Sequence, residues 1–264
     1  MEKIAVIGYG NMGSAFCKGL VKAGFKLAVA EKKEDRQLLL KEELGLEARP
    51  SQEIVAQADL VFLAVKPQEL TDLAEELVTF VRGKAILSII AGYGTDYFIK
   101  TFSTSQVCRM MPNLAAAQAQ AAIGVCFTNK AEPAFKNLCL RIAEAVGKPF
   151  LIHEKLMAAF TGLSGSGIAY IFSFIHALAL GGVATGFSYD EALAIAQKTV
   201  EGALSLLADK KHKPLELMTR VISPAGTTIA GLKQLEAQGF NYAIIKALEE
   251  ATRRAGELEG YKEN

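Results

Sequence analysis

Three glycines near the N-terminus form the first group of residues whose types and spacing could do chemistry. Gly8, Gly10 and Gly13 directly follow an apolar run at residues 4–7 and open a helical pattern. In such a turn the first glycine permits a tight bend, the second lets the backbone approach a pyrophosphate, and the third allows close helix–strand packing. Free N–H groups at the helix N-terminus favour an anion. We therefore predict a dinucleotide site at Gly8, Tyr9, Gly10, Asn11, Met12 and Gly13.

Charged residues after the second β-like run bear on which dinucleotide fits. Glu31 could accept hydrogen bonds from a ribose 2′-hydroxyl, which favours NAD. Lys32, Lys33 and Arg36 follow it and could instead bind a 2′-phosphate, which favours NADP. A solvated charge run at a helix start would have the same composition. The sequence leaves both cofactors open.

Three later strand ends carry small or polar residues. Ligands of open parallel sheets bind outside the carboxyl ends of the strands. We therefore expect a cleft lined by Ala64, Val65, Lys66, Pro67, Ala91, Gly92 and Asn113. For Lys66 a solvent-exposed place at a helix start is the alternative, because Pro67 in the first helical turn already explains the bend.

A second group of candidate residues lies far from the first, at residues 223–228. Pro224 ends one helical pattern, and Thr227 and Thr228 begin the next. The N–H groups of Gly226, Thr227 and Thr228, with the hydroxyl of Ser223, would form an anion site suited to a carboxylate. An ordinary helix N-cap is the alternative explanation of this turn.

The elements around these residues predict an α/β protein with two parts. Strand-like runs occur at residues 3–7, 27–30, 60–65, 85–89, 107–111, 121–127 and 149–152. Helical patterns occur between them at residues 11–23, 34–44, 51–57, 68–80 and 131–146. This alternation predicts an N-terminal Rossmann-type parallel sheet over residues 1–153. Residues 154–264 read as all-α, with helices at 154–161, 165–185, 189–208, 214–220, 227–237 and 242–258. A capping box, Ser188 with Glu191, marks one of these helix starts.

Composition excludes several classes of function. The 264 residues carry 29 Lys and Arg against 28 Asp and Glu, and they contain no Trp. A net charge of +1 therefore argues against a nucleic-acid partner. Four scattered cysteines and three histidines give no metal-ligand spacing and suit a reducing compartment. The short N-terminal apolar run lacks the features of a signal peptide, so we expect a cytoplasmic protein.

Residues 156–189 contain no Asp, Glu, Lys or Arg. That length would suffice for a membrane span. Six glycines, several serines and His176 within it, and the absence of Trp, favour instead a helix buried in a subunit interface. We expect no membrane partner.

Five motifs in one order resemble the pyrroline-5-carboxylate reductase family along essentially the whole chain. They are residues 8–13, 64–67, 111–113, 163–170 and 223–228. The resemblance implies a Rossmann domain followed by a helical domain that forms a homodimer, with larger rings in some members. It also implies NADP as the cofactor, with NAD possible, whose reduced form transfers a hydride to 1-pyrroline-5-carboxylate, giving L-proline.

The resemblance implies roles for individual residues. Thr228 would hydrogen-bond the ring nitrogen as the catalytic residue, while Ser223, Gly226 and Thr227 would hold the substrate carboxylate. On the cofactor side, Ser51 and Lys32 join the positions already named.

This chain departs from the family pattern at Ile168, Thr219 and Ala225, and Gly94 breaks a usual run that begins at Ala91. The departures keep open a paralogue that reduces a different cyclic imine. A β-hydroxyacid dehydrogenase would need a lysine on the helix at 165–185, which has none. A non-catalytic dinucleotide-sensing dimer would have no use for the turn at 223–228.

Overall fold

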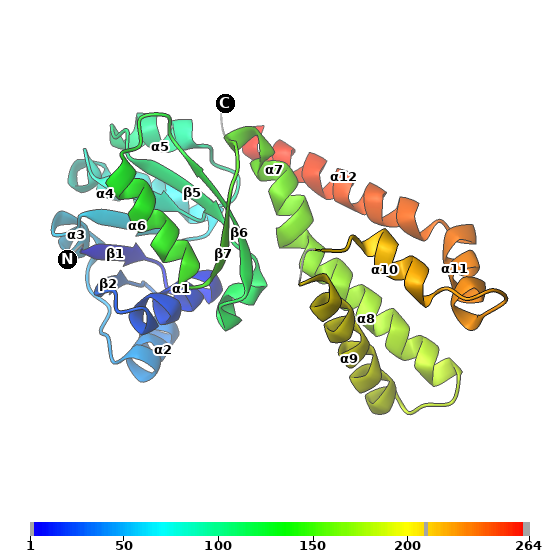
Figure 1. The fold of residues 1–264 in the computed structure, drawn as a ribbon. Coiled ribbons are helices and arrows are strands. Elements are labelled where there is room, and N and C mark those ends of the chain that lie inside the picture. The colour runs from blue at the N-terminus through cyan, green and yellow to red at the C-terminus, as the bar shows by residue number, and fades with distance from the viewer. Residues whose placement is uncertain (1–2, 209–210, 261–264) are drawn as a thin grey trace. The chain divides into compact units, whose positions relative to one another are not determined.

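The computed structural model describes residues 3–208 and 211–260, which form two compact units (Figure 1). Within the described residues, the first unit comprises 3–166 together with 250–260, and the second comprises 167–249. The first holds the sheet and the second is helical. The sequence boundary at 153/154 therefore precedes the point where the compact units divide, and the end of the chain returns to the first unit.

One sheet organises the first unit. Within the described residues its seven strands follow the order β2-β1-β3-β4-β5-β6-β7. The strands are β1 Ile4–Ile7, β2 Leu27–Ala30, β3 Leu60–Leu63, β4 Ala85–Ser88, β5 Val107–Met111, β6 Ala121–Phe127 and β7 Gly147–Leu151. Every expected strand is present, and the Rossmann-type fold class is confirmed.

The predicted parallel sheet contains one antiparallel pair of strands near one edge. Strands β1 to β5 pair in parallel, but β6 runs antiparallel to β5, and β7 is parallel to β6. The physical reason lies in the connection. Between β5 and β6 stands only the short 3₁₀ helix η2 (Leu114–Gln118), whereas a parallel crossover needs a dozen or more residues.

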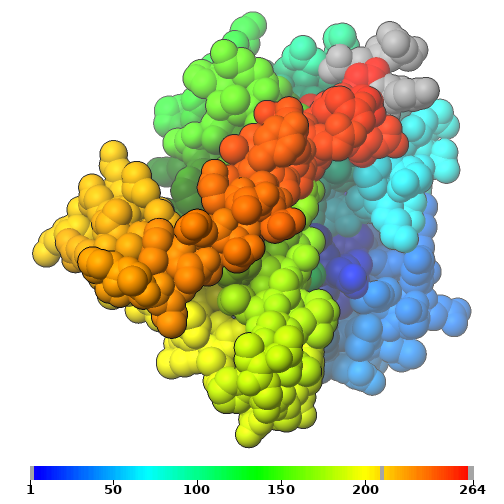
Figure 2. All heavy atoms as spheres, turned by 90° about the vertical axis from the view of Figure 1, so that its right-hand side faces the viewer, coloured from blue at the N-terminus to red at the C-terminus, as the bar shows by residue number. Residues whose placement is uncertain are grey.

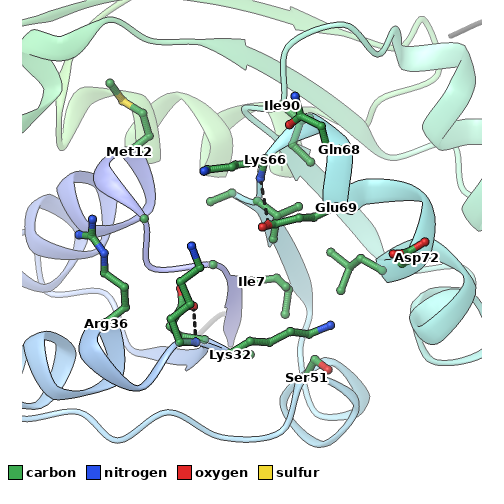
Figure 3. Close-up of a pocket in the computed structure, with 18 of the residues that line it drawn as sticks. Ile7, Met12, Lys32, Arg36, Ser51, Lys66, Gln68, Glu69, Asp72 and Ile90 are labelled. Atoms are coloured by element: carbon green, nitrogen blue, oxygen red, sulfur yellow. Dashed lines mark hydrogen bonds between the residues drawn. The ribbon is translucent and has the colours of Figure 1, made fainter.

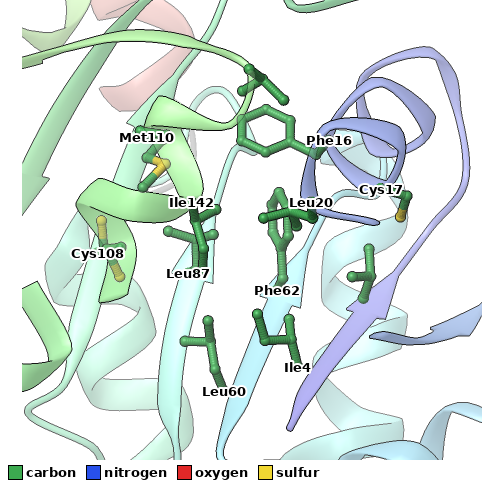
Figure 4. Close-up of a cluster of buried hydrophobic side chains, with 14 of the residues drawn as sticks. Ile4, Phe16, Cys17, Leu20, Leu60, Phe62, Leu87, Cys108, Met110 and Ile142 are labelled. Atoms are coloured by element: carbon green, nitrogen blue, oxygen red, sulfur yellow. The ribbon is translucent and has the colours of Figure 1, made fainter. Parts of the chain in front are cut away.

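Helices cover both faces of the sheet, so the central strands are apolar on both sides. Ile4 and Val6 of β1 enter one core cluster, and Ala5 and Ile7 enter the other. In the first cluster Phe16 of α1 meets Phe62 of β3 edge-on, with ring centroids 5.0 Å apart (Figure 4). Each fully buried side chain of this kind contributes about 1.5–3 kcal/mol. The helices of this unit are α1 Asn11–Lys22, α2 Glu34–Leu44, α3 Ser51–Ala56, α4 Leu70–Val81, α5 Thr95–Phe102, α6 Pro133–Glu144 and α7 Met157–Phe160. Of these, α5 was not predicted from the sequence.

The second unit consists of helices. They are α8 Gly167–Ala184, α9 Tyr189–Leu207, α10 Pro214–Val221, α11 Thr227–Ala237 and α12 Phe240–Gly260, whose last residues belong to the first unit. The predicted capping box is confirmed, since Ser188 and Glu191 cap α9 reciprocally. A π-helical turn, η4 (Thr161–Ser166), precedes α8.

The surface of α8 is strongly apolar. In the single chain Ala179 is buried, whereas Ile171, Phe172 and Leu180 are each at least half exposed. By length and composition the helical stretch Glu154–Ala184 could cross a membrane, and 6% of its most apolar window is buried. Figure 2 shows one face of this unit, coloured from yellow-green to orange along the chain. Large exposed apolar surfaces of this kind are typical of interaction sites.

Candidate active site

A cavity of about 880 Å³ opens at the carboxyl edge of the sheet. From β1 the chain continues to β2 on one side of the sheet, and from β3 it continues to β4 on the other side. Ligands of open α/β sheets bind at such a switch point. Its walls come from the ends of β1, β2, β3 and β4. Figure 3 shows Met12 and Arg36 on one side of the cavity and Lys66, Glu69 and Asp72 on the other.

The three glycines of the turn have three distinct geometric requirements. Gly8 has a φ of +103°, and a Cβ there would lie 2.8 Å from the carbonyl oxygen of Ala64. At Gly13 a Cβ would lie 2.2 Å from the carbonyl oxygen of Gly8. At Gly10 a Cβ would meet none of the described atoms within 4 Å, because this position faces the cavity. The first and third glycines are needed for packing, and the second leaves space for a ligand.

The N-terminus of α1 supplies hydrogen-bond donors to this cavity. Gly10 is the N-cap and, within the described residues, receives no side-chain cap. The first N–H groups of the helix are therefore free to bind an anion, and the helix dipole favours negative charge there. This is the cradle that a pyrophosphate requires.

Glu31 lines the cavity, but its carboxylate is already engaged. Oε2 accepts a hydrogen bond from the Tyr9 backbone N–H at 2.7 Å, and Oε1 accepts one from Lys33 N–H at 2.9 Å. The amide of Gln37 also donates to the Glu31 carbonyl oxygen at 2.7 Å. These bonds fix Glu31 beneath the glycine turn. Each carboxylate oxygen keeps a second lone pair, so a ribose hydroxyl could still bond to Glu31.

Cationic side chains surround the same end of the cavity. Lys32 pairs with Glu76 of α4 at 3.4 Å, and Ser51 also donates to Glu76. Arg36 donates to the neutral side-chain oxygen of Asn11 at 3.2 Å. Hydrogen bonding from Ser51, opposed by burial and helped by Lys32, holds the pKa of Glu76 below its ordinary value. Glu76 therefore stays ionised and offsets the charge of Lys32.

Most of the predicted cofactor residues line this cavity. They are Gly8, Gly10, Asn11, Met12, Glu31, Lys32, Ser51, Ala64, Val65, Lys66, Pro67 and Ala91. Sequence reasoning missed the wall formed by Arg49, Gln52, Gln68, Glu69, Asp72 and Glu76. An isolated bridge between Val29 and Ala48 brings the Arg49–Gln52 segment beside β2, and no local pattern signals that contact.

Four predicted cofactor residues lie outside the lining of the cavity. The side chain of Tyr9 is buried, and its hydroxyl donates to Glu43 at 2.8 Å. Gly13 packs on Gly8, and Gly92 follows the lining residue Ala91 with a φ of +82°. The amide of Asn113 donates to the Ser164 hydroxyl in the π-helical turn at 3.1 Å. Contacts of these four with a cofactor stay a prediction.

The turn at residues 223–228 has an unusual backbone. The N–H of Gly226 donates to the Ser223 carbonyl oxygen at 3.1 Å, and Ala225 adopts a φ of +56°. Ala225 thus adopts the left-handed conformation that favours glycine. A Cβ at Gly226 would lie 2.2 Å from Ser223 Oγ.

Helix α11 begins at this turn with Gly226 as its N-cap. Within the described residues no side chain caps it. The ordinary N-cap, in which a Ser or Thr side chain satisfies the helix, is therefore not what this turn forms. Ser223 and Thr227 are exposed and Thr228 is half-buried. Free N–H groups and hydroxyls together suit an anion.

Metal sites and reactive thiols are not found among the described residues. No group of His, Cys, Asp and Glu there could hold a metal ion. The four cysteines are buried, and burial raises the pKa of the Cys17 thiol to about 12. A thiol of that pKa is not a nucleophile at neutral pH.

Two family models match the chain. Residues 154–258 match the family described as pyrroline-5-carboxylate reductase dimerisation. Residues 3–92 match the family described as NADP oxidoreductase, coenzyme F420-dependent. The dimerisation match begins at 154, whereas the compact units divide between 166 and 167.

Full-length relatives decide the assignment. A protein of Methanosarcina acetivorans named pyrroline-5-carboxylate reductase is 38% identical over 97% of this chain and 98% of its own length. One of Aquifex aeolicus with the same name is 34% identical over 97% of each. The chain belongs to the pyrroline-5-carboxylate reductase family.

The fold of a solved reductase structure agrees with this assignment. The solved structure of a pyrroline-5-carboxylate reductase from Coxiella burnetii matches with a TM-score of 0.89 at 30% identity, over 97% of this chain and 98% of that one. The family resemblance seen in the five motifs is thus confirmed, and the reductase family is one of NAD(P)-dependent oxidoreductases.

Proposed function

We propose that this protein reduces 1-pyrroline-5-carboxylate to L-proline with a nicotinamide dinucleotide. The single observation that carries the proposal is the full-length identity to reductases of that name. The cavity supports it independently. Its glycine turn leaves open the space that a Cβ at position 10 would fill, and free N–H groups of α1 point to a diphosphate.

The dinucleotide would lie along the carboxyl edge of the sheet. The α1 N-terminus would hold the pyrophosphate, and Lys66 would add a positive charge beside it. The backbone at Ala64–Pro67 and Ala91 would line the rest of the dinucleotide site. When bound, the reduced nicotinamide supplies the hydride.

We further propose a preference for NADP. Backbone N–H groups take two of the acceptor sites of the Glu31 carboxylate and compete there with a ribose 2′-hydroxyl. Arg36 donates to a neutral amide and acts on the Glu43 carboxylate through its charge, and its remaining N–H groups would bind a 2′-phosphate. Lys33 lines the same end of the cavity.

The substrate would bind at residues 223–228. Backbone N–H groups of Gly226 and Thr227, with the Ser223 hydroxyl, would hold its carboxylate. The Thr228 hydroxyl would hydrogen-bond the ring nitrogen and so orient the imine carbon. A protonated cyclic imine is already electrophilic, so orientation contributes more than a strong acid would. This requirement fits a turn that has hydroxyls and N–H groups but no carboxylate pair.

We propose that the enzyme is a cytoplasmic homodimer, alone or within a larger ring, with no nucleic-acid or membrane partner. The exposed apolar face of α8 lies inside the segment that matches the dimerisation family. A second chain would cover this face.

The deciding experiment follows oxidation of NADPH and of NADH with 1-pyrroline-5-carboxylate, and separately with a six-membered cyclic imine carboxylate. We expect turnover of the five-membered substrate to exceed that of the larger ring. The opposite order would assign the protein to another cyclic imine, as the changes at Ile168 and Ala225 allow. Dinucleotide binding without turnover of either imine would favour the sensing dimer.

A further inference from the structure

A buried arginine in the sheet contacts two carboxylates from distant parts of the chain. Arg109 lies in β5, and its side chain is 1% exposed. Its Nη1 donates to Glu154 at 2.8 Å, and its Nη2 donates to Glu259. Among the described residues, Nε has no hydrogen-bond partner. The guanidinium is therefore oriented by these two carboxylates.

Glu154 is held from several sides. Beside Arg109, the Thr95 backbone N–H donates to it at 3.3 Å, and the Cys126 thiol donates at 3.2 Å. Burial alone would raise the pKa of Glu154, but the hydrogen bond and charge of Arg109 outweigh that effect and lower it. The carboxylate remains charged and paired at neutral pH.

The two carboxylates occupy special places in the chain. Glu154 begins η3 (Glu154–Leu156), directly after the sheet ends and before the chain enters the helical unit. Glu259 lies at the last turn of α12, where the chain has returned to the first unit. The described chain passes between the units at 166/167 and at 249/250. One guanidinium thus holds the outgoing and the returning segment on the same strand.

Stability alone does not explain this arrangement. Taking a guanidinium out of water is costly, and well-packed apolar residues of similar volume often serve a core at least as well. A buried ion cluster instead favours one geometry, because each displaced carboxylate would leave a buried charge without its partner. The ion cluster therefore specifies where the segments that contain Glu154 and Glu259 attach to β5.

We infer that Arg109 is a positioning residue for turnover, because it fixes to the sheet both segments that lead to the helical unit. The inference rests on the proposed function, since the turn at 223–228 lies on the helical unit and the dinucleotide cavity lies on the other. Arg109 itself lines no part of that cavity. Its loss should affect the catalytic step while cofactor binding persists.

The test uses Glu259→Gln, with Glu257→Gln as its matched control. Glu257 lies on the same helix and pairs with Arg253 and Arg254, away from Arg109. Hydrogen exchange of residues 250–260 and steady-state kinetics are measured for both variants and for Arg109→Lys. We expect Glu259→Gln to increase exchange in this segment about 10- to 150-fold, the effect of one charged hydrogen bond. Its kcat should fall and its NADPH affinity should stay unchanged. Arg109→Lys should lower kcat at least as much, because one ammonium group cannot reproduce the fork of the guanidinium that bonds both carboxylates.

Three outcomes would overturn the inference. Equal hydrogen exchange of residues 250–260 in Glu259→Gln and Glu257→Gln would show that Glu259 does not anchor this segment to Arg109. Increased exchange with unchanged kcat would leave Arg109 a purely structural residue. Parallel loss of NADPH affinity and kcat would indicate general damage. If the wild-type protein reduces no cyclic imine, the proposed function fails, while the exchange comparison still decides whether Arg109 anchors the two segments.

Discussion

A Cβ atom at Gly13 would lie 2.2 Å from the carbonyl oxygen of Gly8, whereas the same atom at Gly10 would point into open space within the described structure. Gly10 and Gly13, three residues apart, therefore have different structural roles. Gly13 lets α1 pack on the end of β1, and Gly10 leaves room for a ligand. Substitution at these two positions should separate folding from binding.

We expect Gly10→Val to fold and to lose dinucleotide affinity by about 100-fold, because its side chain would exclude a phosphate that accepts charged hydrogen bonds from α1. Gly13→Ala should instead lower the free energy of unfolding by about 1–3 kcal/mol, because the helix must move off the strand. Fluorescence titration with NADPH and thermal unfolding measure the two effects. Unchanged affinity in folded Gly10→Val would remove the pyrophosphate from this turn.

The sequence predicts the glycine turn and strand ends well because both are local features. A short apolar strand followed by Gly8 and Gly10 has few structural solutions. The opposite wall of the cavity depends on contacts between distant segments, such as Arg49 beside β2 and Glu76 on α4. The fixed carboxylate of Glu31 is also invisible in the sequence, because its partners are backbone N–H groups. The antiparallel pairing of β6 depends on the connection after β5, which residue periodicity does not report.

Arg36 should set the cofactor preference. Arg36→Ala removes a cation that donates to the neutral amide oxygen of Asn11 and acts on the Glu43 carboxylate through its charge. We expect KM for NADPH to rise about 10-fold, near the lower end for a charged hydrogen bond, and KM for NADH to change little. Lys41→Ala is the control, since Lys41 lies on the same helix and pairs with Glu47 outside the cavity. Equal effects on both cofactors would exclude a 2′-phosphate contact.

Ala225 holds a conformation that favours glycine. Its φ of +56° brings Cβ close to the following carbonyl oxygen, at a cost of about 1–2 kcal/mol. Ala225→Gly should relieve that strain, partly offset by a greater entropy of the unfolded chain. We expect a net gain in stability of at most about 1 kcal/mol by thermal unfolding.

Ala230→Gly provides a control of opposite sign. Ala230 is an exposed residue inside α11, where glycine lowers stability by about 1 kcal/mol. If Ala225→Gly also lowers stability, then the left-handed conformation at this turn is not under strain.

The apolar face of α8 should hold two chains together. Ile171 is 51% exposed in the single chain, so Ile171→Asp would place a charge in the proposed interface. We expect the wild type to sediment as a dimer or larger assembly of 28.3 kDa chains at micromolar concentration. The variant should aggregate or unfold, because its apolar face stays uncovered. Leu38→Asp, at an exposed position of α2, should leave the assembly unchanged. A stable wild-type monomer would contradict the proposed dimer.

Thr228 is where the proposed mechanism is most directly tested. It is the second residue of α11 and is half-buried, and its hydroxyl belongs to the same turn as the free N–H groups. Thr228→Val removes the hydroxyl while keeping the shape of the side chain and the backbone anion site. Losing a hydrogen bond that orients the imine should cost about 1–3 kcal/mol of transition-state stabilisation, roughly 5- to 150-fold in kcat/KM.

Cofactor affinity separates this role from general damage. NADPH binding should not change in Thr228→Val, because the dinucleotide cavity is formed by residues 7–91. Ser223→Ala should have a milder effect, because several N–H groups share the substrate carboxylate with the Ser223 hydroxyl. If Thr228→Val reduces 1-pyrroline-5-carboxylate as fast as the wild type, then its hydroxyl does not contact the ring nitrogen. Orientation of the imine would in that case come from the backbone of the turn alone.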